Sequence, residues 1–97
     1  MRLILHPKVY SDIDRIMERY EQMAGPRLAD DFYEELRRFM ADAARRPESF
    51  SIRDRDIRRV NLERFPYHFL FRIVGDAVRI LIVRQHRRHP SLGTSRR

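Results

Sequence analysis

The stretch RRVNLERFPYHFLFRIVGDAVRILIVRQHRRHPSLG, which begins at Arg58, constrains the fold more than any other part of the chain. Apolar and β-branched residues fill it in short runs, which predicts three successive antiparallel strands at about 57–63, 67–74 and 77–84. The dipeptide Gly75-Asp76 separates the last two runs and is typical of a two-residue hairpin turn. The chain therefore contains an antiparallel sheet, and a basic segment, HRRHP, follows its last strand.

The two-residue turn fixes the register of the last hairpin. If Val74 opposes Ala77, one face carries an unbroken apolar set, namely Ile73, Val78, Phe71, Ile80, Phe69 and Ile82. We expect this face to pack on helices. The opposite face, called the open face below, pairs Arg72 with Arg79, Leu70 with Leu81 and His68 with Val83. It therefore mixes basic and apolar groups.

The Arg72/Arg79 pair calls for a negative charge nearby, because like charges directly opposite on a sheet are destabilising by up to about 1 kcal/mol. Glu63 is expected to share the open face with Arg59 and Asn61. Either Glu63 supplies the counter-charge, or an acidic ligand or partner lies across this face. The leucine pair predicted on the same face also favours a partner surface, since monomers seldom expose such positions beside one another.

The first half of the chain has helical periodicity. A short strand is predicted at Arg2–His6, and Pro7 suits the first turn of a helix. Gly25-Pro26 separates two apolar stripes of helical spacing, so we expect an antiparallel helical hairpin that ends at Pro47. Residues 47–56 are predicted to be a polar connection. The predicted class is α+β with the order β-α-α-β-β-β, in which the N-terminal strand and helical hairpin pack on an antiparallel sheet.

The 97 residues suffice for a single domain, predicted at 1–93 and followed by a flexible basic tail at 94–97. The formal net charge is +7, and twenty Arg stand against one Lys, Lys8, which predicts affinity for nucleic acid, the ribosome or an acidic protein. Because the chain has no Cys, disulfides and cysteine metal sites are excluded. Neither a signal peptide nor a membrane span is recognisable, so we expect a soluble cytoplasmic protein.

Each histidine, considered by itself, is best explained as a solvated or a structural side chain. His86 and His89 lie three residues apart, but no carboxylate accompanies them in that segment, so we expect a solvated basic segment and no metal site. His68 is predicted to be a half-buried structural histidine on the open face. The aromatic residues have core spacing, and Phe69 and Phe71 are expected to point toward the helices rather than to stack on bases.

The order of these segments resembles the RelE/ParE superfamily, the toxins of bacterial type II toxin–antitoxin pairs. The resemblance covers nearly the whole chain, from HPKVYSDIDRI through GPRLADDFYEELRRF to RRVNLERFPYHFLFRI, VRILIV and the H-R-R ending. It implies a small toxin domain with no cofactor. It also implies a cognate acidic antitoxin, partly disordered when free, that wraps the helical hairpin and reaches the basic open face.

The superfamily contains two activities on one fold, and the resemblance leaves both open. ParE-like members poison DNA gyrase without catalytic residues of their own, and the segment QHRRHP is similar to the basic ending of that branch. RelE-like members cut messenger RNA on the ribosome with basic and Tyr or His side chains. If this chain is such a ribonuclease, the matching catalytic candidates are Arg59, Arg72, Arg79, His86 and His89. The sequence departs from that branch because no Tyr follows Tyr67.

The predicted target-binding patch is the same whichever branch applies. It consists of Arg59, Arg72, Arg79, His86, Arg87, Arg88 and His89. The preferred target is DNA gyrase, because the ending QHRRHP is nearer to the ParE-like branch, and the alternative target is the ribosome with its messenger RNA. A remoter alternative is a non-toxic module that binds nucleic acid through its net charge alone, although the sequence has no helix-turn-helix, RNP motif or glycine loop.

Overall fold

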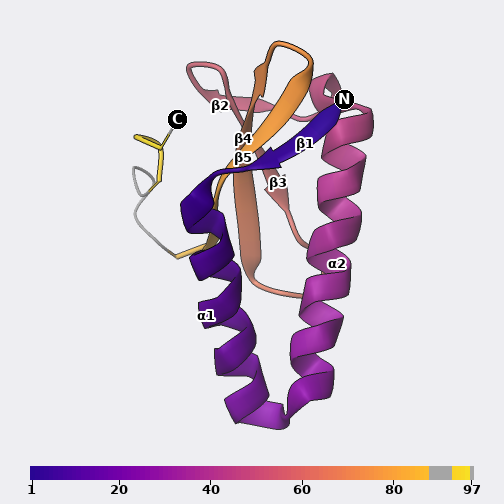
Figure 1. Cartoon of the computed structure of the whole chain (residues 1–97), viewed down its shortest axis with the longest axis vertical. Coiled ribbons are helices and arrows are strands. Elements are labelled where there is room, and N and C mark those ends of the chain that lie inside the picture. Colours follow the sequence, from indigo (N-terminus) through magenta and orange to yellow (C-terminus); the bar gives the residue numbers. More distant parts are fainter. Residues whose placement is uncertain (88–92, 97) are drawn as a thin grey trace.

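The computed structural model describes residues 1–87 and 93–96, which form two helices packed on one five-stranded sheet (Figure 1). The elements are, in chain order, β1 (Arg2–Leu5), α1 (Pro7–Ala24), α2 (Pro26–Arg45), a short 3-10 helix (Pro47–Ser49), β2 (Ile52–Asp54), β3 (Ile57–Asn61), β4 (Tyr67–Val74) and β5 (Ala77–Gln85). The sheet order is β1-β5-β4-β3-β2, with β1 parallel to β5 and all other neighbours antiparallel. The predicted α+β class and helical hairpin are confirmed.

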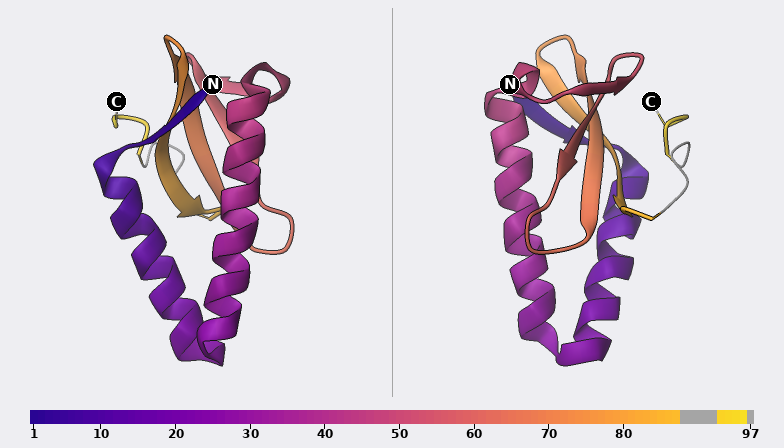
Figure 2. Two further views of the ribbon diagram at one scale, coloured as in Figure 1. Left: turned by 45° about the vertical axis from the view of Figure 1, so that its right-hand side comes forward. Right: turned by 180° about the vertical axis from the view of Figure 1, so that it is seen from behind.

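The two helices begin and end where the sequence supplies suitable caps. His6 precedes α1, and its Nδ1 accepts a hydrogen bond from the backbone N–H of Lys8 at 3.1 Å. Gly25, at a φ of 87°, ends α1, and the proline after it begins α2. Because one residue connects them, the helices meet there and diverge toward the sheet, which lies across one side of the hairpin (Figures 1 and 2).

The core lies between this hairpin and one face of the sheet. The predicted core-face residues Phe69, Phe71 and Val78 are fully buried, and each such side chain contributes about 1.5–3 kcal/mol of stability. Tyr20 and Phe32 of the helices meet Phe65 and Tyr67 through ring contacts with centroids 5.2–6.1 Å apart. This cluster joins the helices to the end of the sheet that carries the candidate site.

The hairpin register agrees with the prediction only near the turn. Val74 opposes Ala77 and the pairing continues as expected to Phe71 opposite Ile80. A bulge at Leu81 then shifts the strands, so that the next pairs are Leu70/Ile82, Phe69/Val83 and His68/Arg84. The predictions that Ile82 faces the helices and that His68 opposes Val83 are therefore wrong, because one extra residue reverses the side to which every later side chain points.

The apolar side chains on the open face are more buried than predicted. Leu70 and Leu81 are 2% and 0% exposed, and they form a second, smaller cluster with Ile57 and Ile82. Gly93 lies against this cluster, since a Cβ built on it would come within 2.5 Å of the Ile82 side chain. The expectation that this leucine pair is exposed, and so favours a partner surface, is therefore wrong, because the described chain buries both side chains.

The connection between α2 and β3 contains structure that the sequence pattern did not indicate. Residues 47–56 include the 3-10 helix and β2, which pairs irregularly with β3 at the edge of the sheet. Arg55 makes the turn between the two strands at a φ of 53°. The strand predicted at 57–63 ends early, at Asn61, and the segment before β4 is a loop. Strand β2 could not be recognised from the sequence pattern because it contains charged residues, which edge strands tolerate on both faces.

Candidate functional site

The structure places the predicted site residues on the open face and on the segment after β5. Arg59 lies on β3, Arg72 on β4 and Arg79 on β5, while His86 and Arg87 follow the last strand. The other two members of the predicted patch, Arg88 and His89, lie outside the described residues. Arg59 and His86 contact each other, with Nη2 of the arginine 3.4 Å from Nδ1 of the histidine. The hairpin arginines form a separate row nearer the turn.

The counter-charge for Arg72 comes from Asp56, not from Glu63. Nε and Nη2 of Arg72 donate to one carboxylate oxygen of Asp56, at 3.0 and 2.7 Å. Glu63 lies in the loop beyond β3, where its backbone N–H donates to the Glu35 carboxylate at 3.0 Å. The alternative in which Glu63 supplies the counter-charge is wrong because β3 ends at Asn61, which removes Glu63 from the sheet. The sequence RDRD before β3 could have indicated this ion pair, since it places the Asp56 carboxylate in the turn that leads into β3.

Arg79 lacks the partner that its neighbour has. It opposes Arg72 in the register, and its Nε is buried without a hydrogen-bond partner among residues 1–87 and 93–96. A buried donor left without a partner costs about 1–3 kcal/mol, so such groups stand out in a folded protein. On the sheet it also lies beside Ile4 of β1. Arg79 therefore differs from Arg72, whose guanidinium is paired with Asp56.

A chain of hydrogen bonds connects Arg84 to the exposed histidine. Nε of Arg84 donates to Nε2 of His68 at 2.8 Å, and Nδ1 of His68 lies 3.0 Å from Nδ1 of His86. Arg59 touches the same atom of His86, and its Nε is held by the Asn61 side chain at 2.7 Å. His68 is only 1% exposed, so the half-buried site predicted for it is in fact fully buried.

The electrostatics of this chain keep both imidazoles neutral. Burial lowers the pKa of His68 to about 3, and the nearby charges of Arg59 and Arg84 act in the same direction. Burial and then Arg59 also lower the pKa of His86. An arginine remains protonated at neutral pH, so the four side chains present two positive charges and two uncharged rings. Arg84 was missed by the sequence reasoning because the bulge had not been foreseen.

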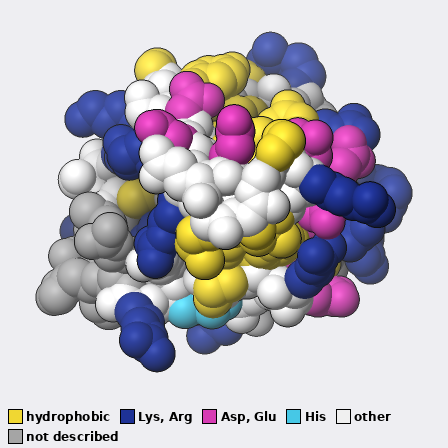
Figure 3. All heavy atoms as spheres, turned by 90° about the horizontal axis from the view of Figure 1, so that it is seen from below, with side chains coloured by type: hydrophobic (Ala, Val, Ile, Leu, Met, Phe, Trp, Pro, Cys, Tyr) yellow, Lys and Arg dark blue, Asp and Glu magenta, His cyan; other side chains and the backbone are white. Residues whose placement is uncertain are grey.

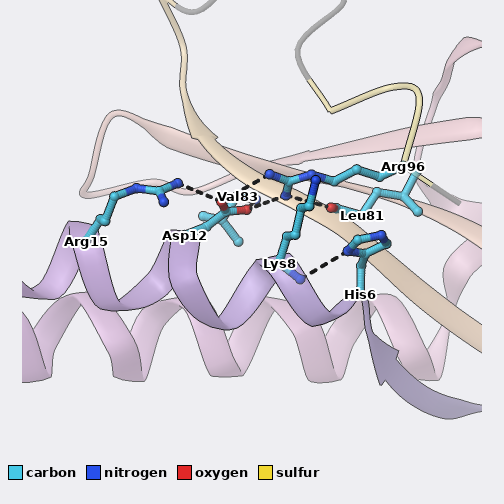
Figure 4. A network of polar contacts seen from close by, with 7 residues as sticks. All are labelled: His6, Lys8, Asp12, Arg15, Leu81, Val83 and Arg96. Carbon is cyan, nitrogen blue, oxygen red and sulfur yellow. Dashed lines mark hydrogen bonds and ion pairs between the residues drawn. The ribbon is translucent and has the colours of Figure 1, made fainter.

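A second polar network surrounds Asp12 of α1, which is 2% exposed (Figure 4). Its carboxylate accepts hydrogen bonds from the backbone N–H of Val83 at 3.1 Å, from Arg96 at 2.7 Å and from Arg15 at 3.0 Å. Arg96 also donates to the carbonyl of Leu81 at 3.1 Å. Asp12 occupies the buried side of α1, and a carboxylate in that apolar stripe was the sequence signal that went unused.

An open pocket of about 420 Å³ lies beside this network, between α1 and the end of β5. Ile16, Tyr67 and Val83 are among its apolar lining residues. Its charged lining consists of Asp12, Arg15, Arg19, Arg84 and Arg96. Seen from the end at which the two helices meet, basic side chains also stand out around the outline of the molecule (Figure 3). The pocket is therefore a positively charged hollow next to the candidate site.

The ranges 1–87 and 93–96 contain no group of three or more His, Asp or Glu side chains that could hold a metal ion. Neither helix is long and apolar enough to cross a membrane, within the same described part of the chain. The hydrogen-bonded side chains of the site are arginine donors and neutral imidazoles.

Known proteins match this chain both in sequence family and in fold. A family model described as the ParE toxin of the type II toxin–antitoxin system parDE matches residues 3–90. Among solved structures, a chain from the chromosomal ParDE toxin–antitoxin system of P. aeruginosa superimposes with a TM-score of 0.78 at 24% sequence identity. That match covers 88% of this chain and 95% of the other. No curated protein matches.

Proposed function

Because this chain belongs to the ParE toxin family of type II toxin–antitoxin systems, we propose that it inhibits growth by poisoning DNA gyrase and that a cognate antitoxin neutralises it. The proposal gives the open face and the segment after β5 a binding role rather than a catalytic one. The proposed contact residues are those of the predicted patch, Arg59, Arg72, Arg79, His86, Arg87, Arg88 and His89. The place of action is the cytoplasm, where gyrase works.

The observation that carries this choice is the state of the two histidines in contact. Cleavage of RNA requires a base that can take a proton from a 2′-hydroxyl. His68 is buried, and Nδ1 of His86 already faces a histidine nitrogen and an arginine. The arginines on the open face are protonated and cannot act as bases at neutral pH. Among the described residues of the patch, binding is therefore better supported than acid–base chemistry.

The antitoxin is proposed to be an acidic chain that is partly disordered when free. Its carboxylates would pair with Arg79, whose buried Nε lacks a partner in the described chain, more profitably than with Arg72, which already has Asp56. Tyr10, Met23 and Tyr33 are exposed on the helical hairpin and offer apolar contacts for the same partner. A complex in which no antitoxin carboxylate approaches Arg79 would contradict this part of the proposal.

The test is induction of the chain in the absence of antitoxin. Growth should stop, and gyrase-dependent breaks should appear in DNA while messenger RNA remains intact. Ribosome-dependent cuts in messenger RNA without DNA breaks would favour the RelE-like alternative instead. A double substitution, Arg87→Ala with Arg88→Ala, should abolish growth inhibition while circular dichroism and thermal unfolding stay unchanged. Full toxicity in that folded variant would refute the assigned contact residues.

A further inference from the structure

The rings of His68 and His86 meet edge to edge. Their planes are 5° apart and their centroids are separated by 5.2 Å, while the two Nδ1 atoms are 3.0 Å apart. A centroid separation this much longer than the Nδ1–Nδ1 distance means that the line between the nitrogens runs nearly in both ring planes. This is the geometry of a hydrogen bond between the rings, and not of face-to-face stacking.

The arginine at the inner end of the chain decides which nitrogen carries each proton. Nε of Arg84 is a donor and has no lone pair, so Nε2 of His68 must accept its hydrogen bond. A neutral His68 then carries its proton on Nδ1 and donates it toward His86. Nδ1 of His86 is consequently the acceptor, and its own proton lies on Nε2. Arg59 points a second donor at that same acceptor.

The position of His86 allows its second ring nitrogen to bind a molecule outside the chain. Its backbone N–H donates to the carbonyl of Pro66 at 3.2 Å, which anchors the residue just after β5. The residue is exposed, and Nε2 has no partner within residues 1–87 and 93–96. We propose that His68 is a positioning residue, which holds His86 as a neutral Nε2–H tautomer whose N–H is a fixed donor to a carbonyl or carboxylate oxygen of the protein target.

The charged groups around the pair reinforce the same state. Arg59 of β3 and Arg84 of β5 flank the rings, and Arg53 of β2 adds positive charge near Arg59. Within the described chain the hydrogen bonds that the two rings make are to each other and to the two arginines, Arg59 and Arg84. A protonated His86 would therefore meet cations and lose both of its inner donors. A neutral N–H next to Arg59 suits an oxygen acceptor on a protein surface.

Long-range proton–nitrogen NMR of the full chain, with histidine rings labelled with nitrogen-15, tests the tautomers without any target. Wild-type spectra should show the Nδ1–H form for His68 and the Nε2–H form for His86. Both should stay neutral as the pH falls through about 6.5, the ordinary histidine pKa. A mixed or Nδ1–H signal for His86, or its protonation near that pH, would overturn the proposal.

Two substitutions of similar size separate positioning from simple packing. In His68→Asn the amide occupies the place of Nδ1 and can still donate to His86, whereas in His68→Gln it occupies the place of Nε2 and can serve only Arg84. His86 should keep its tautomer in His68→Asn and become a mixture in His68→Gln. An unchanged His86 in His68→Gln would contradict the positioning role, whatever the stability of either variant.

The contact with the target rests on the proposed function and is measured separately. His68→Gln should need about five- to tenfold more inducer for the same growth arrest, the effect of losing one fixed hydrogen bond, and His68→Asn should need about the same as wild type. Equal toxicity of both variants, with tautomers that differ as expected, would overturn the contact but not the tautomer assignment. If wild-type induction produces no gyrase-dependent breaks, the proposed function fails and the NMR result still stands.

Discussion

The carboxylate of Asp12 on α1 accepts a hydrogen bond from the backbone N–H of Val83 on β5, across 71 positions of sequence. β1 pairs with β5 only as far as Ile80, so no strand of residues 1–87 and 93–96 lies beside the rest of that edge. The Asp12 carboxylate accepts a hydrogen bond from the buried N–H of Val83 on that edge, and Arg96 donates one to the carbonyl of Leu81. The hydrogen bonds of these two side chains thus replace those that a neighbouring strand would make. They attach α1 and residues 93–96 to the sheet.

Asp12→Ala should therefore lower the free energy of unfolding by about 3 kcal/mol, because it leaves a buried N–H and the mostly buried Arg96 without their acceptor. Urea unfolding followed by circular dichroism measures the change. Asp14→Ala is the matched control, since Asp14 is exposed on the same helix and its loss should change stability by less than about 0.5 kcal/mol. Similar values for the two variants would contradict the role given to Asp12.

Gly93→Ala should destabilise the protein more than Gly25→Ala. Both glycines have positive φ, 84° and 87°, a conformation that alanine rarely adopts, so backbone strain accompanies either substitution. At Gly25 the added methyl group meets open space, whereas at Gly93 it lies 2.5 Å from Ile82. The difference in thermal unfolding between the variants measures that contact together with any difference in backbone strain between the two sites. The flexibility predicted for residues 94–97 stays a prediction, and an equal effect at the two glycines would support it.

The hairpin illustrates what the sequence could specify and what it could not. Gly75-Asp76 fixes the turn, and the pairs from Val74/Ala77 to Phe71/Ile80 follow from it without further information. The bulge is concealed in the run ILIV, where every residue is apolar and a change of face leaves no mark on the alternation. Arg84 was the signal available, since an uninterrupted register would have placed it opposite Tyr67 on the side facing the helices.

The candidate site was predictable to the same extent as the strands that carry it. Arg59, Arg72 and Arg79 could be assigned to the open face because they lie on either side of the hairpin turn or on the strand beside it. The connection from Arg84 through His68 to His86 exists only after the bulge, so alternation alone could not reveal it. Side-chain partners that come from a loop, such as Asp56, depend on where a strand ends.

Arg79→Met should raise the free energy of unfolding by about 1 kcal/mol and reduce toxicity. The substitution keeps the apolar stem, removes a buried Nε that has no partner in the described chain, and relieves the repulsion from Arg72. Arg72→Met is the comparison, because it relieves the same repulsion but breaks the pair with Asp56, and its stability should remain close to wild type. Urea unfolding and growth assays of both variants provide the measurement, and a destabilised Arg79→Met would refute this account of the site.

Acidification should destabilise the wild type through His68. An ordinary histidine has a pKa of 6.5, and burial lowers the pKa of His68 in the folded protein to about 3. Between these values the unfolded chain binds the extra proton, so the stability due to this group is complete above pH 6.5 and declines as the pH falls toward 3. From pH 7 to pH 5 the loss should be about 2 kcal/mol. His86 and His6, whose pKa values are also lowered, act in the same direction.

The variant His68→Asn removes this titration while His86 and His6 remain, so its stability should fall less over the same pH interval. Urea unfolding of both proteins at pH 7, 6 and 5 gives the two slopes, and their difference isolates His68 from the other titrating groups. Between pH 7 and pH 5 the wild type should lose about 2 kcal/mol more of its free energy of unfolding than the variant does. Parallel slopes would mean that His68 takes up a proton in the folded protein as readily as in the unfolded chain, which its bond from Arg84 forbids.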